Sequence, residues 1–261
     1  MNRYLLKEVT PDVINGDVSS VIASNAADKP FSAGDILFDW TAFEIPKGGG
    51  RLDSVVVHVM GEDGATAAEQ DMVLYFAKTV NGAAPNSVGS VNGGFTTGYN
   101  FPKALMGGVK LEGSEAASQL IGPAFGDVLV NAPYSAHGVD GTVIFTAEEG
   151  YPSLGTVGND TFYACGFAGG AYDFSTGVLL NDASNVADDA GTSLTVDGVD
   201  PRKCFQIGDT VYVHDVDTAI GTVASMTATT IVLAANNVGA IADDDELVNA
   251  NPIRIKLGFS L

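Results

Sequence analysis

The residues best suited to chemistry in this sequence are its three histidines, because imidazole can act as acid, base or metal ligand near neutral pH. His58 and His214 stand in strand-like runs, and His137 stands in a stretch rich in glycine and proline. Their spacing matches no histidine or cysteine metal motif, and the sequence has no G-x-S-x-G nucleophile elbow. We therefore expect no catalytic residue, no cofactor and no enzyme activity, and we assign the histidines to packing or to the surface.

Carboxylates form the next candidate site, since calcium takes several oxygen ligands from acidic loops. Asp243-Asp244-Asp245-Glu246 places four carboxylates in a row, close to Asn249. This spacing differs from the EF-hand loop. We interpret the run as a solvated turn, and a calcium ion there is the open alternative.

Aromatic rings at the surface could serve either of two functions, stacking on sugars or packing in a protein interface. The candidates are Trp40, Tyr99, Phe101, Tyr134 and Tyr151. Trp40 stands in an alternating run and is assigned to the core. Tyr99, Phe101 and Tyr134 stand in irregular sequence, which favours a subunit contact at least as much as a glycan contact.

The charge of the chain restricts its partners. It has 32 acidic and 12 basic residues, a formal net charge of −20, and no basic residue between Lys110 and Arg202. Nucleic acid and anionic membranes attract basic proteins, so we expect neither as a partner. With 46% hydrophobic residues the chain can still bury a core.

Two cysteines, Cys165 and Cys204, are too few for a disulfide framework in a chain of 261 residues, so we expect reduced, buried thiols. The first residues contain no apolar run of signal-peptide length, and no run reaches the length of a membrane span. These patterns predict a protein that is made in a cytoplasm and stays soluble.

Short runs of β-branched and aromatic residues, separated by Gly, Asn, Asp and Pro, predict an all-β fold. Residues 36–45 alternate apolar and polar side chains, and residues 51–60 form a strand between two glycine-rich turns. Residues 71–77 are nearly continuously apolar, and further strands follow up to residue 168. Residues 36–180 therefore predict a jelly-roll or β-sandwich domain.

A polar, acidic stretch at residues 181–191 predicts the boundary to a second domain, residues 192–261. Five short strand-like runs follow this boundary, the last of them at residues 253–257. A closed barrel protects strand edges that a small open sheet would expose. The sequence thus predicts a small β-barrel after the sandwich.

Two parts of the chain resemble structural proteins of tailed bacteriophages. The run Phe205-Gln206-Ile207-Gly208-Asp209-Thr210-Val211-Tyr212-Val213, followed by Gly221-Thr222-Val223, is similar to the small SH3-like barrel modules of phage virion proteins. The glycine corner before Leu52-Asp53-Ser54-Val55-Val56-Val57 resembles jelly-roll structural proteins of aquatic tailed phages. The resemblance implies a virion protein that binds other virion proteins, foremost the major capsid protein.

The irregular segments, residues 1–35 and 81–135, are the expected contact regions. Residues 1–35 are too apolar for an inert tail and too irregular for a core strand, so we expect an N-terminal arm along a neighbouring subunit. Deleting residues 1–25 would then leave a folded protein that no longer assembles. The expected interface residues are Tyr4, Leu5, Leu6, Val18, Val21, Ile22, Tyr99, Phe101 and Tyr134.

The leading hypothesis is a capsid decoration or cement protein, a homo-oligomer on the outside of the phage head that bridges capsid subunits. The acidity favours the outside of a shell, because packaged DNA would repel the chain inside it. The alternative is a tail, baseplate or adsorption protein that contacts a host surface glycan. A polysaccharide-acting enzyme built from scattered carboxylates is the third hypothesis.

Overall fold

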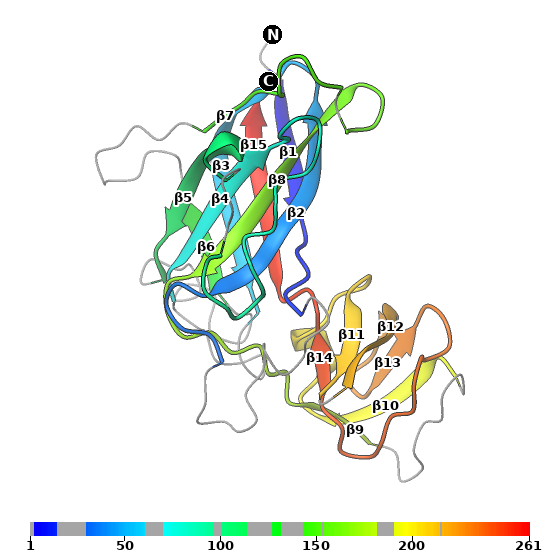
Figure 1. Cartoon of the computed structure of the whole chain (residues 1–261). Coiled ribbons are helices and arrows are strands. Elements are labelled where there is room, and N and C mark those ends of the chain that lie inside the picture. Colours follow the sequence, from blue (N-terminus) through cyan, green and yellow to red (C-terminus); the bar gives the residue numbers. More distant parts are fainter. Residues whose placement is uncertain are drawn as a thin grey trace.

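The computed structural model describes residues 3–14, 30–60, 70–96, 101–113, 127–131, 143–152, 154–181, 191–214 and 216–261. Within these residues the chain consists almost entirely of antiparallel β-strands, which form a two-sheet sandwich and a smaller barrel (Figure 1). The all-β class and the combination of a sandwich with a barrel are confirmed.

The sandwich consists of two sheets packed face to face. The strand order of the first sheet is β1 (Tyr4–Val9), β15 (Ile253–Ser260), β3 (Gly50–Val59) and β6 (Asp127–Asn131), with β7 (Ile144–Phe145) also pairing with β3. The strand order of the second sheet is β2 (Ile36–Pro46), β8 (Asn159–Ala168), β4 (Met72–Lys78) and β5 (Leu105–Leu111). A short helix, α1 (Phe101–Ala104), directly precedes β5.

The strand pairs are nested along the chain, which makes the sandwich a jelly roll. β1 pairs with β15, β2 with β8, β3 with β6 and β4 with β5, and all four pairs are antiparallel. A long antiparallel hairpin that curls over itself gives this pattern, because it places successive pairs alternately in the two sheets. The jelly roll expected from the sequence is therefore visible in the strand order.

The main core lies between the two sheets and follows from the alternation of side chains along the strands. On β15 the odd-numbered residues of the range 253–259 are buried, whereas Lys256 between them is exposed. Phe145 packs edge-on against Phe162 and Phe259, with ring centroids 5.2 and 5.0 Å apart. Such edge-to-face contacts stabilise the fold beyond the burial of the rings.

The barrel is inserted between β8 and β15 of the jelly roll. Its strand order is β14 (Leu247–Asn249), β11 (Thr210–Val213), β12 (Val216–Met226), β13 (Thr230–Leu233), β10 (Ser193–Gly198) and β9 (Val178–Leu180). A bridge between Leu179 and Glu246 joins the two end strands, so the barrel is nearly closed. A short 3-10 helix, η4 (Pro201–Lys203), lies between β10 and β11.

Both ends of the chain differ from the expected domain division. Residues 1–35 do not form an arm throughout, because β1 belongs to the first sheet and Val13 and Ile14 are buried in the core. The strand expected at residues 253–257 of the barrel is β15, which pairs with β1 and β3 of the sandwich. β9 precedes residues 181–191 and already belongs to the barrel. The physical reason is the nested pairing, which requires the last strand to return beside the first.

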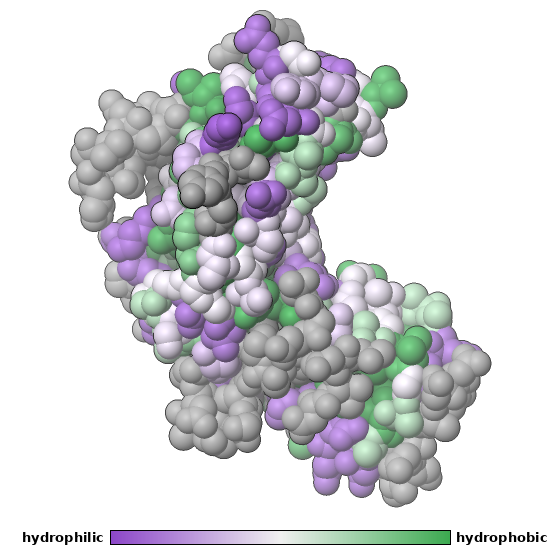
Figure 2. Space-filling view, viewed as in Figure 1, coloured by the Kyte–Doolittle hydropathy of each residue, from purple (hydrophilic) through white to green (hydrophobic). Residues whose placement is uncertain are grey.

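The sandwich and the barrel form two lobes with a recess between them on one side (Figure 2). Residues 169–177 and 250–252 connect the lobes. At the far end of the sandwich, away from the barrel, the amide of Leu261 donates to the carbonyl oxygen of Arg3 at 2.8 Å (Figure 1). The first and last described residues therefore lie side by side, opposite the lobe junction.

Candidate functional site

The outer face of the β2-β8-β4-β5 sheet is apolar and forms the first candidate site. Two clusters of buried residues lie on this face, outside the main core. Their buried members come from the strands and from the connection between β4 and β5: Ile36, Ala77, Val80, Val88, Ala104, Tyr163, Cys165 and Phe167. Burial on both faces explains why β4 and β8 are nearly continuous apolar runs in the sequence.

Four aromatic rings of this apolar outer layer surround an open groove. Phe95 and Phe101 of the β4–β5 connection have ring centroids 4.9 Å apart, and Phe95 lies 5.8 Å from Phe167 of β8. Tyr75 of β4 lies 5.6 Å from Phe167 and completes the set. The aromatic groove has a volume of about 550 Å³, and Phe95 is 47% exposed. An exposed apolar surface of this kind marks a site for another apolar surface.

The aromatic groove offers few hydrogen-bonding side chains. Apart from its four rings, it is lined by Ala33, Gly34, Val73, Ala168 and Gly169. Among the residues that the structure describes, the lining contains no charged side chain, and the Tyr75 hydroxyl is its polar side-chain group. A glycan needs several polar groups to fix its orientation, so this surface fits the apolar side chains of a protein better.

Hydrogen bonds hold the β4–β5 connection on the sheet beneath the groove. The Asp39 carboxylate accepts the amides of Trp40 at 2.8 Å and of Val88 at 3.0 Å. The Trp40 indole donates to the carbonyl oxygen of Asn86 at 2.9 Å. Trp40, expected in the core, is half-buried in this outer layer. Hydrogen bonds therefore hold residues 86–88 of this connection on the sheet.

Glu148 anchors the start of the same connection. Its carboxylate accepts the amides of Asn81 at 2.7 Å and of Gly82 at 2.9 Å. Both hydrogen bonds favour the charged carboxylate, the one from Gly82 most, so the pKa of Glu148 lies below its ordinary value. The Tyr151 hydroxyl also donates to the side-chain oxygen of Asn81 at 3.3 Å. This end of the loop is thus tied to the segment after β7.

The two cysteines are buried and form no disulfide, as expected. Cys165 lies in the apolar layer under the aromatic groove, where burial and the nearby Asp39 carboxylate raise the pKa of its thiol far above its ordinary value. A thiol that stays protonated is a poor nucleophile. The Cys204 thiol donates to the carbonyl oxygen of Thr176 at 3.4 Å. Both cysteines therefore have packing roles.

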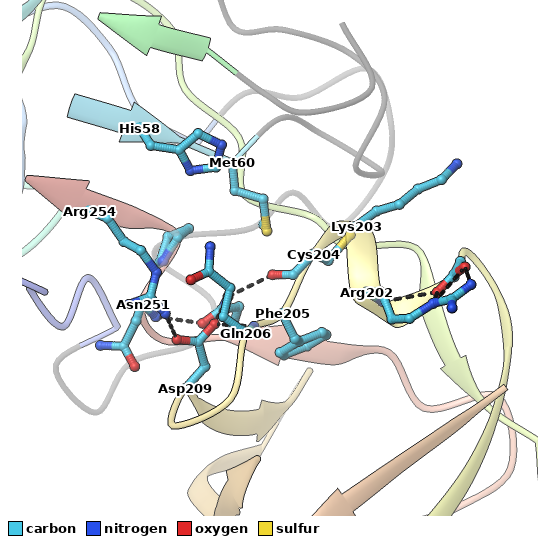
Figure 3. A pocket seen from close by; sticks show the side chains of 13 residues that line it. His58, Met60, Arg202, Lys203, Cys204, Phe205, Gln206, Asp209, Asn251 and Arg254 are labelled. Carbon is cyan, nitrogen blue, oxygen red and sulfur yellow. Dashed lines mark hydrogen bonds and ion pairs between the residues drawn. The ribbon is translucent and has the colours of Figure 1, made fainter. Parts of the chain in front are cut away.

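The junction between the lobes is the second candidate site (Figure 3). Arg254 of β15 forms an ion pair with Asp209 of the barrel and lies 3.5 Å from the Glu8 carboxylate of β1. The side chains of Arg254 and Asp209 are only 15% and 2% exposed. Asp209 also accepts the amide of Gln206 at 2.8 Å and the side-chain amide of Asn249 at 2.9 Å. A buried, hydrogen-bonded ion pair thus links the two lobes.

Further polar contacts support this ion pair. Burial raises the pKa of Asp209 above its ordinary value, while the Arg254 guanidinium and the hydrogen bonds act in the opposite direction. The Asn251 side-chain amide donates to the carbonyl oxygen of Pro11 at 3.0 Å, and its oxygen accepts the amide of Thr210 at 3.1 Å. The lobes are therefore held by side-chain contacts in addition to the two connections.

Two cavities of about 360 and 320 Å³ open at the junction. His58, Gln206 and Arg254 border both cavities, which together form what we call the junction groove. In Figure 3, His58 and Met60 lie on one side of the larger cavity, and Gln206 and Asn251 lie on the other. The groove is thus lined by the sandwich on one side and by the barrel on the other.

Two carboxylates of the acidic run at residues 243–246 accept hydrogen bonds from backbone amides. The Asp245 carboxylate accepts the amide of Ala242 at 2.7 Å. The Glu246 carboxylate accepts the amides of Thr176 at 2.8 Å and of Gly177 at 3.0 Å. In the part of the chain that the structure describes, no group of three or more His, Cys, Asp or Glu side chains is placed to hold a metal ion. This geometry supports the interpretation of the run as a turn.

Comparison with protein-family models, curated proteins and solved structures finds no match to this chain. Across the described ranges, no helix is long and apolar enough to cross a membrane. The function is therefore inferred from the geometry of the aromatic groove and of the junction groove.

The interface residues expected from the sequence lie on two different surfaces. Tyr4 and Leu6 of β1 are 63% and 59% exposed on the outer face of the first sheet, while Leu5 between them packs against the core. Phe101 lies in the aromatic groove. Several candidates fall outside the described residues: Val18, Val21, Ile22, Tyr99, Tyr134 and His137.

Three rings of the aromatic groove, Tyr75, Phe95 and Phe167, were not among the expected interface residues. The sequence contains a signal for Tyr75 and Phe167, since residues 71–77 and 160–168 are apolar at both odd and even positions. Such runs indicate a sheet covered on both faces. No local pattern shows which ring stays uncovered, because the cover comes from a connection whose path the sequence does not reveal.

Proposed function

We propose that this chain is a non-enzymatic structural protein of a tailed-bacteriophage particle. In this proposal it is a decoration or cement protein that binds the outside of the head and stabilises neighbouring copies of the major capsid protein. Jelly rolls are common among viral capsid domains, which supports this setting. The likeness of the barrel segment and the glycine corner to phage virion proteins supports it as well.

The aromatic groove is the observation that carries the proposal. Two of its rings, Tyr75 and Phe167, stand on strands of the sheet, so little conformational entropy is lost when a partner docks on them. Each square ångström of apolar surface buried on docking contributes about 25 cal/mol, and aromatic residues are prominent among the energetic centres of protein interfaces. A partner that inserts apolar side chains would therefore bind here without using the acidic surface.

The acidity of the chain fits a position on the outside of the head. Packaged DNA would repel a chain with a net charge of −20 from the inside. Neighbouring copies also repel one another, but exposed charges are screened over about 8 Å at physiological salt. Contact between apolar surfaces can therefore dominate at close range.

A tail, baseplate or adsorption protein that contacts a host glycan is the second candidate function. The exposed ring of Phe95 favours it, because sugars stack on aromatic faces. The nearly apolar lining of the groove favours the capsid partner, since a sugar would leave its hydroxyl groups without hydrogen bonds there. The two candidate functions predict different losses when the groove is mutated: the first predicts loss of binding to the capsid, and the second predicts loss of binding to a host glycan.

A binding experiment with phage heads that lack the chain tests the proposal. The purified chain should bind these heads and raise the temperature at which they open, and moderate salt should leave binding unchanged. Phe95→Glu should abolish binding, because it places a charge among the rings. Val238→Glu is the matched control, since Val238 is a 54% exposed apolar residue of the barrel.

Two results would contradict the proposal. Equal binding of wild type and Phe95→Glu would show that the aromatic groove does not contact the head. Failure of the wild-type chain to bind heads, together with retention on host-surface glycans, would favour the adsorption protein instead.

A further inference from the structure

The junction groove differs in charge from the rest of this acidic chain. This groove is a surface separate from the aromatic groove and plays no part in the proposed capsid contact. Four of the chain's 12 basic residues border the two cavities: Arg202, Lys203, Arg254 and Lys256. Three of its 32 acidic residues do so: Glu8, Asp200 and Asp209. The groove is thus a local reversal of a net charge of −20.

Most of the opposite charges in the groove already neutralise one another. Arg202 donates to both carboxylate oxygens of Asp200, from Nε to Oδ1 at 3.0 Å and from Nη2 to Oδ2 at 2.6 Å, and turns away from the cavity in Figure 3. Arg254 pairs with Asp209 and lies near Glu8. These residues build the walls of the groove, and the two remaining basic residues are Lys203, which interacts electrostatically with Asp200, and Lys256, which stands opposite Glu8 on β1.

Lys203 and Lys256 are both exposed, and neither forms an ion pair with a residue that the structure describes. Lys203 lies on η4 of the barrel and borders only the larger cavity. Lys256 lies on β15 of the sandwich and borders only the smaller one. An anion that contacts both lysines must therefore extend across the junction. The side chains of His58 and Gln206 lie along its path and can form hydrogen bonds.

We propose that the junction groove binds an extended acidic peptide segment of a partner chain, with one carboxylate at Lys203 and another at Lys256. Charge-assisted hydrogen bonds from ammonium to carboxylate would fix the segment at both ends. Since the two lysines border different cavities, we do not expect a compact anion such as phosphate to contact both. The net charge of −20 repels any anion, and it repels nucleic acid most, because every nucleotide carries a phosphate.

Fluorescence anisotropy of a labelled peptide with alternating glutamate and alanine residues, titrated with the whole chain, tests this inference. The wild-type chain should bind the peptide saturably, and added salt should weaken binding. Lys203→Glu/Lys256→Glu should weaken binding by about tenfold or more, because two exposed ion pairs become repulsive contacts. Neither inorganic phosphate nor a short oligothymidylate should displace the peptide at matched ionic strength.

The control is Lys47→Glu/Lys103→Glu, which changes the net charge equally at two exposed lysines outside the groove. It should bind the peptide within about twofold of wild type, because neither lysine borders the groove and exposed charges are screened by salt. Unchanged binding by the junction variant, or an equal loss in the control, would overturn the inference. Displacement by phosphate or by the oligonucleotide would overturn it as well. Circular dichroism of both variants would establish that they fold.

Discussion

The two sheets of the jelly roll have opposite outer faces. The β2-β8-β4-β5 sheet is covered by a second apolar layer that ends in the aromatic groove. Apart from the exposed Tyr4 and Leu6 of β1, the β1-β15-β3-β6 sheet presents charged and polar side chains to its outside, among them Glu8, His58, Arg254 and Lys256. One face of the sandwich is therefore suited to an apolar partner, whereas the other is suited to polar contacts and to the barrel.

The difference follows from the residues of the strands. On β15 every second side chain is polar or glycine, so one face of the sheet is buried and the other meets water. On β4 and β8 apolar residues occupy both kinds of position, so both faces need a cover. The β4–β5 connection supplies only part of that cover. The uncovered remainder is therefore where we expect a partner to bind.

The largest effect is expected from removing the edge of the charged sheet. Deletion of residues 1–14 removes β1 and the buried Val13 and Ile14, so the jelly roll should lose its cooperative unfolding transition. Thermal unfolding followed by circular dichroism measures this. Deletion of residues 1–25, which the sequence predicted to be harmless to folding, should unfold the sandwich for the same reason. A truncated chain with a wild-type transition would contradict the role of β1.

The next effect concerns the ion pair that joins the charged face to the barrel. Asp209→Ala leaves Arg254 without its buried partner, which should lower the free energy of unfolding by about 3–5 kcal/mol. Urea unfolding at neutral pH measures the difference. Lys256→Ala, on the same strand as Arg254 but exposed, should change it by less than about 0.5 kcal/mol. A similar small loss in both variants would mean that the ion pair does not hold the lobes.

A third pair of variants compares the two outer faces directly. Ile36 is fully buried on the outer face of the apolar sheet, so Ile36→Ala should lower the free energy of unfolding by about 2–5 kcal/mol. Val56 is half-buried on the outer face of the charged sheet, and Val56→Ala should cost less than about 1 kcal/mol. Equal losses in urea unfolding would refute the idea of a second core on one face alone.

The smallest effect is expected at Glu148, which anchors the loop over the apolar face. Because its pKa in the folded chain is lowered, the stability that it contributes is present above the ordinary carboxylate pKa of about 4.3 and is lost as the pH falls through the lower folded value. Amide hydrogen exchange should show less protection at Asn81 and Gly82 in acid, and already at neutral pH in Glu148→Gln. Glu149→Gln is the control and should show wild-type protection.

Much of the fold could be predicted from the sequence. The glycine corner before residue 50, the strand at residues 51–60 and the barrel strands at residues 210–213 and 230–233 all lie where the local pattern placed them. The membership of the terminal strands could not be predicted. β1 and β15 pair across nearly the whole chain, and no local pattern encodes a contact at that separation.

The candidate sites were less visible in the sequence than the strands. Phe101 was expected at an interface and lies in the aromatic groove, but Phe95 stands in a connection without regular periodicity. The junction groove could not be predicted at all. Asp209 and Arg254 form a pair only because the chain leaves the sandwich, builds the barrel and returns as β15.

Hydroxyl-radical footprinting of the chain, free and bound to phage heads, shows which rings a partner covers, because Tyr and Phe rings react readily when exposed. The claim is that the apolar outer face docks on a partner protein. The rings of Tyr75, Phe95 and Phe101 should become protected on binding, while Tyr4 on the charged sheet should react as it does in the free chain. Protection of Tyr4 with unchanged reactivity of Phe95 and Phe101 would contradict the account.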